Sequence, residues 1–102
     1  MYKRTHTCGE LDNSHIGEKV ILNGWVNTSR LHGKVVFIDV RDRYGKTQLV
    51  LDETTFSNEF DSIKKLSSED VISVEGIVKS RDGGAENAEM KTGAIEIAVS
   101  KF

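Results

Sequence analysis

The chain has 102 residues, of which 37% are apolar and 29% charged, and its formal net charge is −2. This length is enough for one domain with a buried core and too short for a catalytic domain beside a second module. Its one cysteine, Cys8, excludes an intramolecular disulfide and a cysteine-built zinc site, and the three histidines are scattered at His6, His15 and His32. No run is apolar enough for a membrane span, and no apolar stretch follows the basic N-terminus, so we expect no secretory signal, no membrane partner and a cytoplasmic location.

The first half of the chain has the alternating pattern of strands. β-branched and aromatic residues predict a first strand over 20–27, which Gly24 allows to bend. A second strand is predicted over 35–41 and a third over 47–51, and the turn residues at 42–45 close the two into a hairpin.

The second half begins with a change of period. Residues 55–67 predict one amphipathic helix, with Thr54 or Thr55 available as its N-cap. The strand pattern then resumes over 71–79 and, after a polar loop, over 94–99. The apolar face of the helix consists of Phe56, Phe60, Ile63 and Leu66.

Five strands with a helix between the third and the fourth predict an all-β fold. The order fits a five-stranded Greek-key barrel of the OB type, with residues 1–102 as a single domain. An SH3-like barrel is the competing fold. It does not normally place a helix between its third and fourth strands, so we prefer the OB barrel.

Alternation sorts each strand into an inward and an outward set. The outward set of strand two is Phe37, Asp39 and Arg41, and the other strands send Gln48 and Glu96 to the same outer surface. The pattern therefore predicts an exposed aromatic side chain surrounded by polar ones. The inward set is Val36, Ile38, Val40, Leu49, Leu51, Ile95, Ile97 and Val99.

This outward set is what an OB fold needs to hold single-stranded nucleic acid. Phe37 offers a flat ring for stacking an unpaired base, and Gln48 and Glu96 offer donors and acceptors for its edge. Structural explanations stand beside the functional one. A loop or a neighbouring domain often covers a lone aromatic on a barrel, and polar residues on a solvated strand need no function.

Other candidate chemistry is weaker. Cys8 and His6 lack the third, orienting group that nucleophilic catalysis needs, so Cys8 is predicted to be an ordinary buried or half-buried cysteine. Asp39, Asp42 and Asp52 do not have the spacing of a calcium-binding loop. They are predicted to be surface or turn carboxylates.

The order of the motifs resembles one known family. The runs are Thr-His-Thr-Cys-Gly-Glu-Leu at 5–11, Ser-His-Ile-Gly at 14–17, Leu-Asn-Gly-Trp-Val-Asn at 22–27, Val-Phe-Ile-Asp-Val-Arg-Asp-Arg-Tyr-Gly-Lys-Thr-Gln at 36–48 and Thr-Gly-Ala-Ile-Glu-Ile at 92–97. Together they resemble the N-terminal anticodon-binding OB domain of bacterial aspartyl-tRNA synthetases, over nearly the whole chain.

The resemblance implies a tRNA partner and assigns roles to the outward residues. The position of Phe37 stacks on the middle anticodon base, a uridine, and the position of Gln48 hydrogen-bonds that base. The position of Glu96 contacts the first anticodon base, a guanosine or its modified form. Further positions that match the RNA-binding pattern are Arg30, Arg81, Asn87 and Met90.

One departure from the family affects charge. Where the family has three arginines and an aspartate, this chain has Thr28, Ser29, Arg30 and Leu31. Threonine and serine cannot replace the charge-assisted bonds of arginine, so we expect weaker RNA binding or an altered tRNA identity.

A second departure is the catalytic part of the resembled enzyme. Its ATP, Mg²⁺ and aspartate belong to a separate catalytic domain, so we expect no cofactor and no amino-acid activation in these residues. The resemblance implies that the parent enzyme is a homodimer, whereas this domain is expected to be a monomer. Two alternatives stay open: a free-standing OB protein that binds single-stranded nucleic acid, and a protein-interaction domain that kept the barrel and lost the RNA surface.

Overall fold

The computed structural model describes residues 3–68, 70–81 and 95–102. A short 3-10 helix, η1 (Asn13–His15), precedes the first strand, and a helix, α1 (Phe60–Lys64), lies between the third and fourth strands. The strands are β1 (Lys19–His32), β2 (Val35–Asp42), β3 (Gly45–Asp52), β4 (Val71–Ser80) and β5 (Ile95–Lys101).

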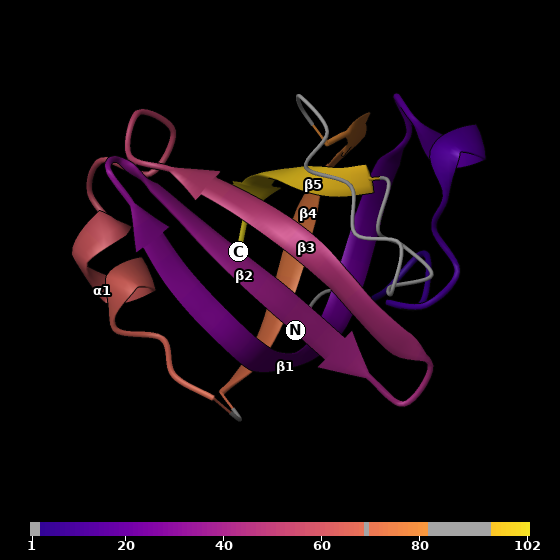
Figure 1. Cartoon of the computed structure of the whole chain (residues 1–102), viewed down its shortest axis with the longest axis horizontal. Helices are drawn as coiled ribbons and strands as arrows, with labels where there is room; N and C mark the ends of the chain where they lie inside the picture. Colours follow the sequence, from indigo (N-terminus) through magenta and orange to yellow (C-terminus); the bar gives the residue numbers. More distant parts are fainter. Residues whose placement is uncertain (1–2, 69, 82–94) are drawn as a thin grey trace.

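The five strands form a closed barrel in the order β1-β2-β3-β5-β4 (Figure 1). β1 closes it by pairing with β4 through its first half and with β2 through its second half. All the pairings are antiparallel except that of β3 with β5, which is parallel. The predicted OB-type barrel is therefore confirmed.

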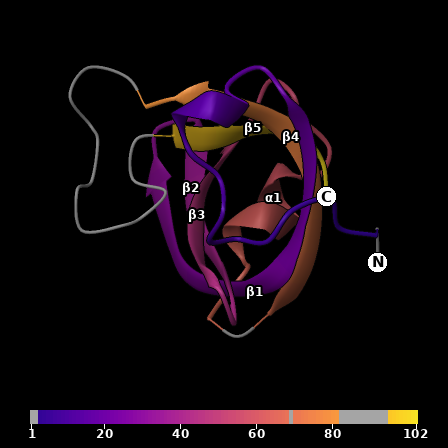
Figure 2. The same ribbon diagram turned by 90° about the vertical axis from the view of Figure 1, so that its right-hand side faces the viewer.

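The helix α1 lies across one end of the barrel, where the ring of strands surrounds it in the side view (Figure 2). Phe60 and Ile63 of the helix and Phe56 of the turn before it are buried in the core, and Leu66 packs against this core. The predicted apolar face of residues 56, 60, 63 and 66 is therefore observed. Every residue of the predicted inward set of strands two, three and five is also buried.

β1 is the longest strand because it bends from one side of the barrel to the other. A side chain at Gly24 would collide with the backbone carbonyl of Arg41, so glycine lets the two strands approach closely at the bend. The register then shifts between Val26 and Thr28, as in a β-bulge. The glycine-dependent bend predicted for this strand is confirmed.

Two predicted boundaries are wrong. The first strand does not end at 27 but continues to His32, because residues 28–32 keep pairing with β2. The regular helix covers only Phe60–Lys64 rather than 55–67.

The predicted helix cap is also wrong. The residue at the N-cap is Glu59, and its side chain makes no capping hydrogen bond. The backbone N–H of Thr55 instead donates to the carboxylate of Asp52 (2.8 Å), which turns the chain at the end of β3 before the helix starts. The predicted fifth strand is observed from Ile95 onward, and residue 94 lies outside the described part of the chain.

Candidate nucleic-acid interface

One line of polar side chains crosses the outer face of the barrel from β1 to β4. Thr28 is paired with Asp39, Asp39 with Gln48, and Glu96 with Lys79. The parallel pairing of β3 with β5 brings Gln48 and Glu96 together. We call these five residues the polar row.

Hydrogen bonds join the middle of this row to Arg30. The Arg30 guanidinium donates to Oε1 of Gln48 (3.2 Å), and Nε2 of Gln48 donates to Oε1 of Glu96 (3.1 Å). The other oxygen of Glu96 lies 3.3 Å from Nζ of Lys79. Because a guanidinium only donates and a carboxylate only accepts, the two neighbours fix which end of the Gln48 amide faces each of them.

The β1 end of the row is less completely paired. The hydroxyl of Thr28 donates to Oδ2 of Asp39 (3.0 Å). The other oxygen, Oδ1, is buried without a hydrogen-bond partner in the described part of the chain. A buried acceptor of this kind costs free energy until a donor reaches it.

A second line of side chains runs beside the polar row on the same face. Phe37 is paired with Val50, Val50 with Ala98, and Ala98 with Ile77. We call these four residues the apolar row. Three of them are half-buried, whereas Ile77 is 41% exposed. The ring of Phe37 meets that of His32 edge-on, at 5.7 Å between centroids.

The two rows together suit a planar ligand with a polar edge. Such a ligand can lie with its ring on Phe37 and its edge toward Gln48, within reach of the Arg30 guanidinium. This combination matches an unpaired nucleic-acid base.

The predicted outer face is confirmed, but the predicted exposure is partly wrong. Arg41 is exposed on this face, as expected, whereas Phe37, which was predicted to be exposed, is half-buried. Gln48 and Glu96 belong to the same face, yet each is only 6% exposed. They are buried because they satisfy each other's hydrogen bonds, which alternation within single strands cannot show.

The remaining predicted RNA-binding residues follow β4 in the sequence. Arg81 follows β4 directly and is buried, and its Nε donates to the backbone carbonyl of Ile95 (3.1 Å), which ties the end of β4 to the start of β5. Asn87 and Met90 lie outside the described residues. Their assignment stays a prediction.

Sequence reasoning missed four residues of this face: Lys79, Val50, Ala98 and Ile77. All four occupy outward positions of their strands, so the alternation was visible. What the sequence did not show is the register between β4 and β5, which places Lys79 on Glu96 and Ile77 on Ala98.

Cys8 is an ordinary buried cysteine, as predicted. Burial raises the pKa of its thiol, and the nearby Asp42 carboxylate raises it further. Asp42 is indeed a turn carboxylate, but it is buried, because it accepts the backbone N–H groups of Cys8 (2.8 Å), Tyr44 (2.8 Å) and Gly45 (3.2 Å). Both residues therefore hold the N-terminal segment on the β2–β3 turn.

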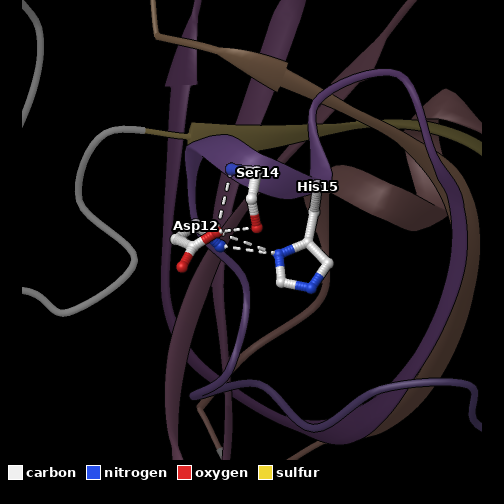
Figure 3. A network of polar contacts seen from close by, with 3 residues as sticks. All are labelled: Asp12, Ser14 and His15. Atoms are coloured by element: carbon white, nitrogen blue, oxygen red, sulfur yellow. Dashed lines mark hydrogen bonds and ion pairs between the residues drawn. The ribbon is translucent and has the colours of Figure 1, made fainter.

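The other polar cluster caps η1 (Figure 3). Oδ1 of Asp12 accepts the backbone N–H (2.8 Å) and the hydroxyl (2.5 Å) of Ser14, and the backbone N–H of Asp12 donates to Nδ1 of His15 (3.1 Å). Nδ1 of His15 also lies 3.2 Å from Oδ1 of Asp12. The cluster is a helix cap.

The described residues also bear on metal binding and on membrane insertion. No group of three or more His, Cys, Asp and Glu side chains there could hold a metal ion. No helix among them has the length and apolar character needed to cross a bilayer.

Residues 20–102 match the family model of the tRNA anticodon type described as an OB-fold nucleic acid binding domain. The chain belongs to this OB-fold family. Its match includes every residue of both rows and all five strands except Lys19, the first residue of β1.

Relatives of this OB-fold domain are parts of longer enzymes. An aspartate–tRNA(Asp/Asn) ligase of Dictyoglomus turgidum is 50% identical over 100 residues, which cover 98% of this chain and 17% of the ligase. The chain thus spans about a sixth of the relative that it matches. An asparaginyl-tRNA synthetase structure from Pyrococcus horikoshii is 34% identical with a TM-score of 0.82, over 99% of this chain and 22% of that one.

The same OB fold also occurs in a protein-binding molecule. The structure of OBody AM2EP06 bound to hen egg-white lysozyme is 27% identical to this chain with a TM-score of 0.82. It covers 99% of this chain and 92% of the OBody.

Proposed function

We propose that the outer face formed by the polar and apolar rows binds the anticodon loop of a tRNA, as the anticodon-recognition module of a cytoplasmic aspartate–tRNA ligase. The observation that carries this proposal is the position of Phe37, half-buried beside Arg30 and Gln48 on an OB barrel. Family membership and the ligase relatives support it independently. ATP, Mg²⁺, aspartate and the homodimer interface would belong to the rest of such an enzyme.

Within this proposal, each residue has a distinct task. Phe37 stacks on the middle base, an interaction that any of the four bases can make. Gln48 reads the edge of that base through its remaining N–H and lone pair. Glu96 accepts hydrogen bonds from the first base, and Arg30 supplies positive charge beside the stacked ring. Arg81 and Asn87 contribute from the end of β4 and beyond.

The second candidate is a protein-binding OB domain. Its support is the OBody bound to lysozyme, together with the loss of two arginines from the family's RNA-binding pattern at Thr28 and Ser29. A free-standing domain that binds another single-stranded nucleic acid is a variant of the first proposal.

The test is a titration against anticodon stem-loops that carry GUC or differ only in the middle base. We expect Phe37→Ala to weaken binding to every loop by about 1–3 kcal/mol, or roughly 5- to 160-fold in Kd. Gln48→Ala should weaken binding to the GUC loop and leave binding to a loop with cytidine as its middle base nearly unchanged. Tyr44→Ala is the matched control, because Tyr44 is 55% exposed in the β2–β3 turn, away from the two rows.

The salt dependence gives a second readout of the same titration. Each phosphate contact adds about −0.7 to the slope of log K against log salt concentration, and few cations line this face, so we expect a shallow slope. Unchanged affinities for both Phe37→Ala and Gln48→Ala would refute the RNA site and favour the protein-binding candidate.

A further inference from the structure

We propose that Lys79 is a positioning residue for base discrimination, acting through Glu96 on the amide of Gln48. The inference rests on the proposed RNA-binding function and names a residue that the family resemblance does not assign. Its physical basis is a relay of contacts that runs from β1 to β4 across the face.

Lys79 lies directly opposite Glu96 in the β4–β5 pair, with 3.3 Å between Nζ and Oε2. The Lys79 side chain is 44% exposed, whereas the Glu96 side chain is buried. A buried carboxylate is costly unless it is paired, so this ammonium compensates the charge of Glu96 and holds Oε2 on the β4 side.

With Oε2 held by Lys79, the other oxygen of Glu96 faces Gln48 and accepts its Nε2–H at 3.1 Å. The amide oxygen of Gln48 consequently turns toward Arg30, at 3.2 Å. One N–H and one lone pair of the amide remain for a base, in a fixed arrangement that suits the edge of a uridine.

Removing the ammonium changes this arrangement. The Glu96 carboxylate then has no charge partner in the row, and it either turns toward water or takes up a proton. A turned carboxylate releases the amide of Gln48, and a protonated one donates to it and reverses its orientation. In both cases the preference for uridine falls, while the stacking surface of Phe37 is unchanged.

The competing role for Lys79 is a direct contact with an RNA phosphate. The two roles differ in salt dependence, because an ammonium paired with Glu96 releases no RNA counterions, whereas a phosphate contact adds about −0.7 to the slope. They also differ in whether Glu96 is required for the effect.

The experiment compares Lys79→Met and Lys79→Arg, each in the wild-type and the Glu96→Gln background, against stem-loops with uridine or cytidine as the middle base. Lys79→Met should lower the uridine-to-cytidine affinity ratio by about two- to tenfold, the size of one hydrogen bond, with an unchanged salt slope. Lys79→Arg should restore the ratio, and Lys79→Met should have no further effect in Glu96→Gln. Lys19→Met is the matched control, since Lys19 faces Glu75 (3.7 Å) and lies outside the relay.

A second readout needs no RNA, so it separates this inference from the proposed function. We expect NMR to show that the Nε2 proton of Gln48 that faces Glu96 is protected from exchange in wild type and Lys79→Arg, with the protection lost in Lys79→Met. Retained protection, a Lys79→Met effect that persists in Glu96→Gln, or an equal loss for both loops with a flatter salt slope would each overturn the positioning role. Absence of binding by the wild-type protein to any stem-loop would refute the proposed function instead.

Discussion

Arginines introduced at positions 28 and 29 should act very differently, although the family pattern has arginine at both. Simple restoration of charge would predict two new phosphate contacts and a salt slope steeper by about 1.4, at about 0.7 per contact. The register of β1 with β2 argues against this. Thr28 pairs with Asp39 on the outer face, whereas Ser29 pairs with Ile38, a core residue, and therefore points to the opposite side.

At position 28 the guanidinium would meet a carboxylate before it met a phosphate. Oδ1 of Asp39 is buried without a partner in the described residues, and leaving such an acceptor unsatisfied costs about 1–3 kcal/mol. Satisfying this acceptor would recover that free energy, but ordering a long arginine side chain costs about 1.5–2 kcal/mol. The variant also loses the hydroxyl of Thr28, which donates to Oδ2, so Thr28→Arg should raise the free energy of unfolding by at most about 1 kcal/mol. The RNA salt slope should hardly change.

The assay combines urea unfolding with stem-loop titrations at several salt concentrations. Ser29→Arg should alter neither the RNA affinity nor the slope. Thr28→Arg combined with Asp39→Asn frees the guanidinium, so this double variant should steepen the slope by about 0.7. A steeper slope for Thr28→Arg alone, equal to that of the double variant, would refute the pairing with Asp39.

Three further results are expected. Because burial raises the pKa of the Cys8 thiol and so depletes the reactive thiolate, Ellman's reagent should label Cys8 far more slowly in the folded protein than in guanidinium. Hydrogen bonds from Ser14 lower the pKa of Asp12 below its ordinary value of 3.8. The stability that this cap provides should therefore be present above pH 3.8 and lost as the pH falls through the lowered pKa. An NMR titration, with Asp12→Asn as the control, checks this. A side chain at Gly9 would collide with the backbone carbonyl of Tyr44, so Gly9→Ala should lower the unfolding free energy by about 1–3 kcal/mol or more in urea.

Features that depend on one segment at a time could be predicted from the sequence. The alternation of Val36, Ile38 and Val40 identified the core side of β2, and Phe37 followed as an outward residue. The apolar period also located the segment around Phe60 that covers the barrel end. Each of these patterns reflects burial of a single strand or helix.

Features that depend on pairing between distant strands could not be predicted. Gln48 and Glu96 are 48 positions apart, and their hydrogen bond exists because β3 and β5 run parallel in one particular register. A shift of one residue would send Glu96 to the core. The predicted helix length was also wrong, because only Phe60–Lys64 forms a regular α-helix and the residues before it form turns.

The two rows would contribute differently to RNA binding, the apolar row to affinity and the polar row to discrimination between bases. Under the proposed function, stacking on Phe37 and the apolar row would strengthen the binding of any base, whereas Gln48 has only one N–H and one lone pair uncommitted. A domain with net charge −2, and with Thr28 and Ser29 at the positions where the resembled family has arginines, would also gain less from phosphates, and that gain carries no base information. Loss of phosphate contacts would therefore lower the affinity for matched and mismatched loops alike. The ratio of the two affinities would still be determined by the polar row. Discrimination can survive the loss of the arginines, provided that the relay from Arg30 to Lys79 keeps the amide of Gln48 in one orientation.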